Sequence, residues 1–138
     1  MRPPGGGAVA AVRQGLALHQ AGRLREAEAL YRQVLGVRPG HAAAAHFLGL
    51  LLHQTGRGTE GLPLIEQSVR AEPKSADFLN NLGTVLRDLG RRTAAAEQFR
   101  RAVALRPDML AARDNLGSVL KLEGWHEAAE EVFRGTIG

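Results

Sequence analysis

Residues 76–109 read ADFLNNLGTVLRDLGRRTAAAEQFRRAVALRPDM, and the rest of the chain repeats the pattern of this 34-residue stretch. Its proline, Pro107, follows Pro39 and Pro73 at intervals of 34 residues. Its two glycines recur at the same interval, as Gly15, Gly49, Gly83, Gly117 and as Gly22, Gly56, Gly90, Gly124. Eight of the 17 glycines therefore occupy only two positions of one period, which indicates a tandem repeat protein.

The period divides the chain into repeats 1 to 4, which span residues 8–41, 42–75, 76–109 and a shortened 110–138. Within each repeat, mostly apolar residues occupy positions 7, 10, 11 and 14, and then positions 20, 24, 27 and 28. This spacing predicts two amphipathic helices per repeat. We expect the glycine at position 15 to end the first helix and the proline at position 32 to end the second.

The glycine at position 8 lies inside the first predicted helix, where glycine costs about 1 kcal/mol relative to alanine. Position 20 of the second helix is also small and is filled by Ala27, Gly61, Ala95 and Ala129. Position 24 carries a large side chain and is filled by Tyr31, Ile65, Phe99 and Phe133. We therefore predict that the two helices approach closely at the small residues and that position 24 fills the remaining space.

These features resemble the tetratricopeptide repeat, in particular Asn80-Asn81-Leu82-Gly83 and Asp114-Asn115-Leu116-Gly117 in the first helices. The resemblance covers residues 8–138, and the array of repeats resembles those of bacterial N-terminal tetratricopeptide modules. It implies an all-α solenoid, a right-handed superhelix of about four helical hairpins that forms one domain over residues 8–138. Residues 1–7, with Gly5-Gly6-Gly7, are expected to form a disordered tail.

Two departures from the repeat pattern lead to further expectations. In repeat 2, Gly58, Gly61 and Pro63 predict a second helix that starts late, with Thr59 as its N-cap. Repeat 4 stops at Gly138 without its proline, so the apolar side of the last hairpin is expected to be uncovered. Either the natural protein continues, or this end is buried in a homo-oligomer.

Composition excludes several classes of function. Hydrophobic residues make up 44% and aromatic residues 4% of the 138 residues, which favours packed helices, and cysteine is absent. No apolar run is long enough for a membrane span, and no secretory signal is visible, so a cytoplasmic protein is expected. The net charge of +4 is not concentrated in a basic strip interleaved with aromatic residues, so nucleic acid is not expected as a partner.

No constellation of residues predicts catalysis. His126-Glu127-Ala128-Ala129-Glu130 resembles a zinc protease motif but has Glu130 where the second histidine belongs. The few serines and threonines have no arranged base. We therefore expect no catalytic residue, no metal site and no cofactor.

The resemblance implies that the first helix of each repeat lines a concave groove through positions 2, 5, 9 and 12, with position 6 nearby. Position 12 offers only basic or protonatable groups, which suggests a peptide partner with acidic groups. The predicted peptide-binding residues are His19, His46, Phe47, Leu50, His53, Asn80, Asn81, Thr84, Arg87, Asp114, Asn115, Ser118 and Lys121.

The sequence therefore predicts a non-catalytic scaffold that binds a protein or an extended peptide in its groove. Two alternatives stay open at this point. The chain could be the N-terminal arm of a longer enzyme of the glycosyltransferase or sulfotransferase type, because the asparagines at position 6 resemble those in the arm of O-linked N-acetylglucosamine transferase. It could also be an adaptor that self-assembles through its uncovered end.

Overall fold

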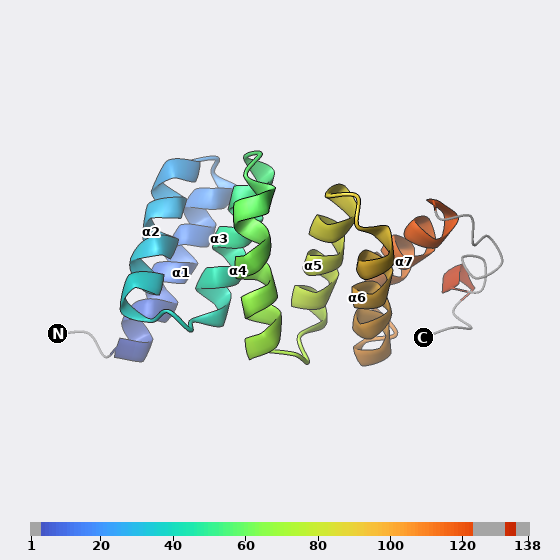
Figure 1. Cartoon of the computed structure of the whole chain (residues 1–138). Coiled ribbons are helices and arrows are strands. Elements are labelled where there is room, and N and C mark those ends of the chain that lie inside the picture. Colours follow the sequence, from blue (N-terminus) through green and yellow to red (C-terminus); the bar gives the residue numbers. More distant parts are fainter. Residues whose placement is uncertain (1–3, 123–131, 135–138) are drawn as a thin grey trace. The chain divides into compact units, whose positions relative to one another are not determined.

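The computed structural model describes residues 4–122 and 132–134, and this part of the chain contains long helices and no strand (Figure 1). The helices are α1 (Pro4–Gln20), α2 (Leu24–Val37), α3 (Ala42–Gln54), α4 (Gly58–Ala71), α5 (Ala76–Asp88), α6 (Arg92–Leu105) and α7 (Leu110–Leu122). They follow the predicted order, with a first and a second helix in each of repeats 1 to 3, and α7 is the first helix of repeat 4. The prediction of an all-α array of helical hairpins is confirmed. None of these helices is both long enough and apolar enough to cross a bilayer.

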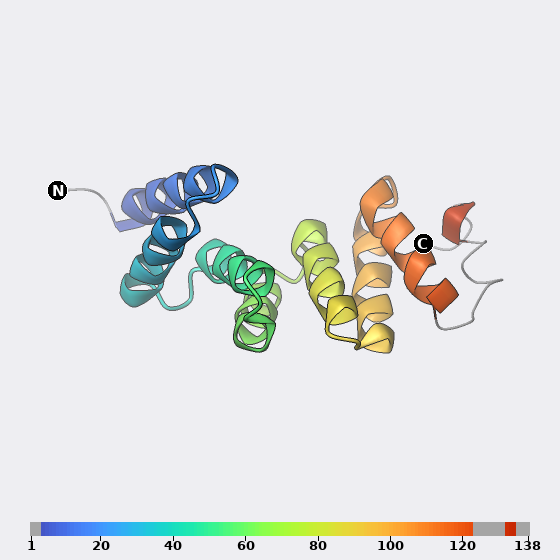
Figure 2. The same cartoon turned by 90° about the horizontal axis from the view of Figure 1, so that it is seen from above.

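Contacts divide the chain into two compact units, one that ends at Ala71 and one that begins at Glu72. The first unit contains α1 to α4, and the second contains α5 to α7, with α6 packed beside α5 and α7 beside α6 (Figure 2). The boundary lies at the end of α4, four residues before the junction of repeats 2 and 3. In a repeat protein each hairpin packs chiefly on its sequence neighbours, and the single domain predicted over residues 8–138 stays a prediction.

The first helix begins earlier than the repeat pattern predicts. Helix α1 starts at Pro4, so residues 4–7 are helical and the prediction of a disordered tail is wrong for them. Proline suits the first helical position because its φ angle is already helical and its missing N–H would have no partner there. Residues 1–3 lie outside the described residues.

The turn inside each hairpin is made by the glycine at position 15, as predicted. Gly22, Gly56 and Gly90 have φ angles of 79°, 83° and 83°, which residues with a side chain rarely adopt. The next residue then donates its N–H back to the first helix, as from Arg23 to Leu18 at 2.9 Å. This hydrogen bond satisfies a backbone carbonyl group at the end of the first helix and fixes the direction in which the second helix starts.

The predicted close approach of the two helices is also confirmed. A Cβ atom added at Gly15 would lie 2.5 Å from Tyr31 Cε1, and one added at Gly83 would lie 2.5 Å from Phe99 Cε1. Both rings are fully buried. The position-8 glycine is therefore required by packing, because the position-24 ring occupies the space of a side chain.

In repeat 2 the two helices approach even more closely, because the residues at positions 24 and 20 both differ from those of the other repeats. Ile65 stands where the other repeats have a ring, and Gly61 stands where they have alanine. A Cβ added at Gly49 would lie 2.8 Å from the carbonyl oxygen of Gly61, and one added at Gly61 would meet the carbonyl oxygen of Gly49. Here backbone packs directly against backbone.

The prediction that the second helix of repeat 2 starts late is wrong. Helix α4 begins at Gly58, at the same repeat position as α2 and α6. The carbonyl of Arg57 accepts the N–H groups of Glu60 and Gly61 at 3.1 and 3.0 Å, so Thr59 is already inside the helix. Pro63 is accommodated within α4.

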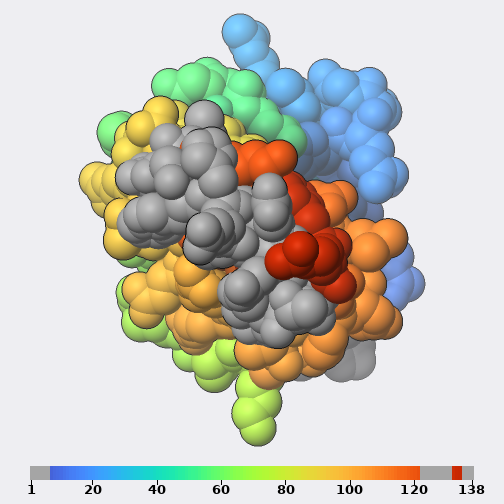
Figure 3. All heavy atoms as spheres, turned by 90° about the vertical axis from the view of Figure 1, so that its right-hand side faces the viewer, coloured from blue at the N-terminus to red at the C-terminus, as the bar shows by residue number. Residues whose placement is uncertain are grey.

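In repeat 4 the structure describes α7 and residues 132–134, which lie against it (Figure 3). Phe133 packs on Gly117, as position 24 packs on position 8 elsewhere, and Lys121 Nζ lies 4.9 Å from the centre of its ring. The motif at residues 126–130 and the last residues, 135–138, lie outside the described residues. Self-association through this end of the chain therefore stays a prediction.

Gly61→Ala restores the alanine of the other repeats, yet we expect it to lower the unfolding free energy by about 2 kcal/mol. The new methyl group would meet the carbonyl oxygen of Gly49, and helix backbone cannot move aside as a flexible side chain can. Gly36→Ala is the matched control, because nothing lies within 4 Å of its added Cβ. Urea unfolding of both variants tests this, and equal stability of the two would contradict it.

Tyr31→Phe is expected to stabilise the protein by about 1 kcal/mol. The hydroxyl of Tyr31 is buried without a hydrogen-bond partner, and burial raises its pKa to about 12. Removing an unpaired buried polar group relieves its desolvation penalty. Phe99 fills the equivalent position in repeat 3. Thermal and urea unfolding measure the change, and a loss of stability would show that the hydroxyl is paired.

Candidate functional site

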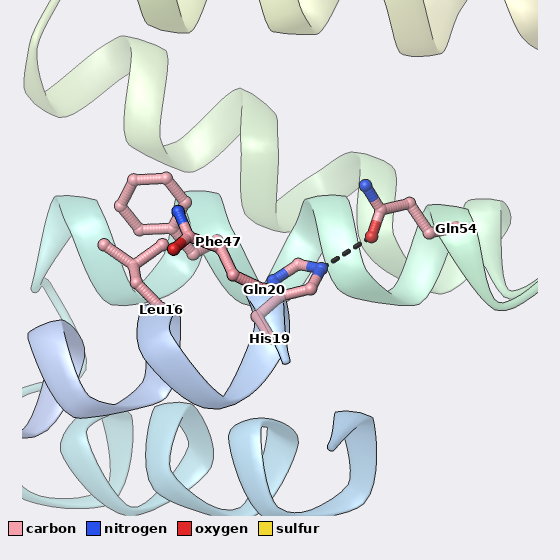
Figure 4. A pocket seen from close by; sticks show the side chains of 5 residues that line it. All are labelled: Leu16, His19, Gln20, Phe47 and Gln54. Carbon is pink, nitrogen blue, oxygen red and sulfur yellow. Dashed lines mark hydrogen bonds between the residues drawn. The ribbon is translucent and has the colours of Figure 1, made fainter. Parts of the chain in front are cut away.

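In the first unit, α1 and α3 form an open pocket of about 410 Å³ between their exposed faces. Its lining residues are Leu16, His19, Gln20, Phe47 and Gln54. Leu16 and Phe47 lie side by side and make the apolar part of the pocket, whereas the histidine and the two glutamines form its polar part (Figure 4). The pocket therefore offers both kinds of contact that an extended peptide needs.

A hydrogen bond joins the two helices at the polar end of this pocket. His19 Nε2 lies 2.6 Å from Gln54 Oε1 (Figure 4). The bond leaves the N–H groups of the Gln54 side chain available to a ligand carbonyl. The ring of Tyr31 lies 6.4 Å from the ring centres of both His19 and Phe47, so the repeat core supports the pocket.

His46, predicted to line the groove, is fully buried, so this prediction is wrong. Ser68 Oγ donates to the carbonyl of Ile65 at 2.6 Å and lies 3.0 Å from His46 Nδ1. Since the only hydroxyl hydrogen is used by Ile65, the oxygen accepts from the Nδ1–H of His46. Burial lowers the pKa of His46 to about 4, so the ring is neutral near pH 7. It packs edge-on against Phe47, with ring centres 5.3 Å apart, and supports the pocket from inside.

Two further predicted residues of α3, Leu50 and His53, are half-buried and lie outside the pocket lining. Conversely, the sequence prediction missed Gln20 and Gln54, which form part of the lining. A signal for them existed, because they are the same residue at repeat position 13 of repeats 1 and 2. Position 13 directly follows position 12, whose basic or protonatable side chains were the basis of the predicted groove.

In the second unit, α5 and α7 bring three predicted residues into one hydrogen-bonded chain. Asn115 Nδ2 donates to Asn80 Oδ1 at 3.0 Å, and Arg87 Nη1 donates to Asn115 Oδ1 at 3.3 Å. Arg87 Nε lies 3.6 Å from Asp88 Oδ1. The network fixes the guanidinium group while its side chain remains 28% exposed, so it can still meet an anionic group.

The other predicted residues of the second unit surround this network at different depths. Asn80 itself is only 8% exposed and therefore acts through Asn115 rather than at the surface. Asn81 and Thr84 are half-buried, and Thr84 Oγ1 donates to the carbonyl of Asn80 at 3.1 Å. Asp114, Ser118 and Lys121 are exposed. The predicted residues thus form one group in each unit, and a continuous groove through all repeats stays a prediction.

The charged side chains of the first unit are organised differently on its second helices. Glu28 and Arg32 of α2 meet Arg57 and Glu60 at the start of α4 in four ion pairs with N–O distances of 2.9 to 3.2 Å. Burial would raise the pKa of Glu28, but hydrogen bonds from Arg32 and Arg57 outweigh it and lower that pKa. Hydrogen bonds from the same two arginines lower the pKa of Glu60. These charges satisfy one another.

The described residues contain no candidate metal site. Within residues 4–122 and 132–134, no three histidine, aspartate or glutamate side chains are grouped so that they could hold a metal ion. What the two surfaces can do is donate hydrogen bonds, offer apolar contact and attract negative charge.

The sequence matches the family model described as tetratricopeptide repeat over residues 12–76, 58–109 and 80–138. The chain belongs to the tetratricopeptide repeat family. Proteins built from tetratricopeptide repeats are scaffolds for protein interaction, and the open faces of α1, α3, α5 and α7 are the surfaces that such a scaffold has to offer. No curated protein matches this tetratricopeptide repeat chain significantly.

Solved structures support the same fold. A crystal structure of MamA superposes with a TM-score of 0.86 at 16% identity, over 94% of this chain and 75% of that one. A MamA from Desulfovibrio magneticus RS-1 gives a TM-score of 0.84 at 26% identity, over 94% of this chain and 73% of that one. A mutant O-GlcNAc transferase from Thermobaculum terrenum gives 0.81 at 26% identity, over 87% of this chain but only 23% of that one.

His46 predicts a pH dependence of stability. Its pKa is about 4 in the folded protein and 6.5 in the unfolded chain, so the unfolded chain binds more protons between these values. The unfolding free energy is therefore expected to fall by up to about 3 kcal/mol as the pH drops from 6.5 to 4. His46→Asn keeps a donor for Ser68 without titrating. Urea unfolding at several pH values should show a smaller decrease for this variant, and parallel curves would contradict the assignment.

Proposed function

We propose that this chain is a non-catalytic scaffold that binds extended peptide segments of partner proteins through the first helices of its repeats. The observation that carries the proposal is the pocket between α1 and α3. It is open to solvent, it combines apolar side chains with amide groups, and a buried layer formed by Tyr31 and His46 supports it. An extended peptide needs both parts of such a pocket, because its side chains seek apolar contact and its backbone seeks hydrogen bonds.

The second unit supports an acidic character of the bound segment. Arg87 is held by Asn115 and remains partly exposed. Lys121 is exposed one repeat further on, at the same repeat position. A carboxylate of the partner would form charge-assisted hydrogen bonds with either group, and these are stronger than hydrogen bonds between neutral groups.

The test is affinity capture from a lysate of the source cell, followed by mass spectrometry, with the wild type and the double variant Arg87→Glu/Lys121→Glu. A partner that binds through this surface is expected to be retained by the wild type and lost by the variant, because both attractive charges become repulsive. The matched control, Arg91→Glu/Arg101→Glu, changes the charge equally at the N-cap and on the body of α6. It should retain the partner.

Before the capture experiment, circular dichroism is used to check that the wild type and the two double variants are equally helical. Equal recovery of the same proteins by both variants would show that the polar surface of the second unit serves only to keep the protein soluble. That result would contradict the proposal for α5 and α7.

A second candidate function is that of an arm in a longer glycosyltransferase. The observation that favours it is the match to the O-GlcNAc transferase, in which this chain corresponds to 23% of the neighbour's length at 26% identity. The mass of the natural polypeptide distinguishes the two functions. Immunoblotting of the source cell with an antibody against α1 to α4 should reveal a product near 14.8 kDa for a separate scaffold and a much larger one for an enzyme arm.

A further inference from the structure

The first unit separates its charges between its two kinds of helix. Residues 1–71 contain four carboxylate side chains, Glu26, Glu28, Glu60 and Glu66, and all of them lie on α2 or α4. Helices α1 and α3 contain no acidic residue at all. The face that carries the pocket therefore has no negative charge of its own.

The carboxylates on the other helices are also largely neutralised where they stand. Glu28 and Glu60 share the ion pairs with Arg32 and Arg57, and Glu26 pairs with Arg23 at 2.8 Å. The positive charge on the face with the pocket is not part of these pairs. Arg13 of α1 is exposed and forms no ion pair within the described part of the chain. It is the charge that a ligand on this face would meet.

Arg13 is placed to act together with the pocket. It precedes Leu16 by three residues and Gln20 by seven, so the three side chains lie on one face of α1. Residues three apart on a helix have Cβ atoms about 5–6 Å apart. Alternate residues of an extended peptide are separated by about 6.6 Å, since each rises about 3.3 Å. The two spacings are similar, and the long side chain of Arg13 can span the difference.

We infer that the pocket between α1 and α3 binds a large apolar side chain of an extended peptide and that Arg13 binds a carboxylate two residues away from it. This inference rests on the proposed function and specifies the ligand. The ligand is an extended peptide in which an acidic residue and a large apolar residue, in either order, are separated by one residue of any type. Leu16 and Phe47 contact the apolar side chain. Gln20 and Gln54 lie on the side of Leu16 away from Arg13 and are available to the peptide backbone that continues there.

The test is selection of random heptapeptides displayed on phage, first against the wild type and in parallel against Arg13→Glu. Arg25→Glu is the matched control, since it makes the same change of charge at an exposed position of α2 in the same repeat. The wild type and the control should both enrich peptides with an aspartate or glutamate two positions from a leucine, methionine or phenylalanine. Arg13→Glu should instead enrich lysine or arginine at the charged position.

Synthetic copies of the enriched peptides, labelled with fluorescein, then give dissociation constants by fluorescence anisotropy. Arg13→Glu should weaken binding of the acidic peptides on the order of tenfold, and Phe47→Ala should remove the preference for a large apolar residue. Because Phe47 also packs on the core, Gln54→Ala is a second variant at the pocket, expected to weaken binding without affecting folding.

The inference fails if the peptides enriched by the wild type lack the acidic position, or if Arg13→Glu and Arg25→Glu bind them equally. Peptides that lose affinity only with Arg87→Glu/Lys121→Glu would overturn this inference and leave the proposed function intact. Peptides that respond to neither set of variants, or no enrichment at all, would overturn both.

Discussion

The contact between a glycine of the first helix and the large side chain at position 24 of the second helix determines how this protein is built. At Gly15 and Gly83 the ring of Tyr31 or Phe99 occupies the space that any side chain would need, which fixes the distance between the helices. Glycine inside a helix lowers the unfolding free energy, and the apolar contacts of the buried ring offset this loss. Every repeat relies on this contact, and position 8 is glycine in all four repeats. In repeat 2 the second helix differs at two positions, with Ile65 at position 24 and Gly61 in place of alanine at position 20, and both pack on Gly49.

Once that distance is fixed, the outer faces of the first helices become free to differ. The residues at the core positions of α1, α3, α5 and α7 are restricted by packing, whereas those at positions 6, 9, 12 and 13 are not restricted in this way in all repeats. In the first unit they form a pocket with apolar and amide parts, and in the second Arg87 and Asn115, at positions 12 and 6, form a network with the nearly buried Asn80 of position 5. The same scaffold thus presents two chemically different surfaces.

The architecture could be predicted from the sequence because its determinants are local and repeat. The glycine turns, the close approach at position 8 and the order of the helices all follow from residue types at fixed spacings. Two expectations failed where a local rule met a stronger neighbouring effect. Pro4 starts a helix in spite of the three glycines after it, and the carbonyl of Arg57 starts α4 before Thr59.

The candidate site was less predictable, because repeat position says which face a residue lies on but not how deeply it lies. His46 shares its repeat position with Asn80, and both are buried by partners that the period does not reveal, Ser68 in one case and Asn115 in the other. A polar side chain that finds such a partner withdraws from the surface, whereas Arg13, which has none among the described residues, stays available. The separation of charge in the first unit follows the same logic. Three of the four carboxylates, Glu26, Glu28 and Glu60, are paired with neighbouring arginines, and none of the four lies on α1 or α3. The positive charge of α1 is therefore not cancelled by a carboxylate on the same face. Under the proposed function, the polar groups that the fold leaves unpaired would determine which ligand is bound.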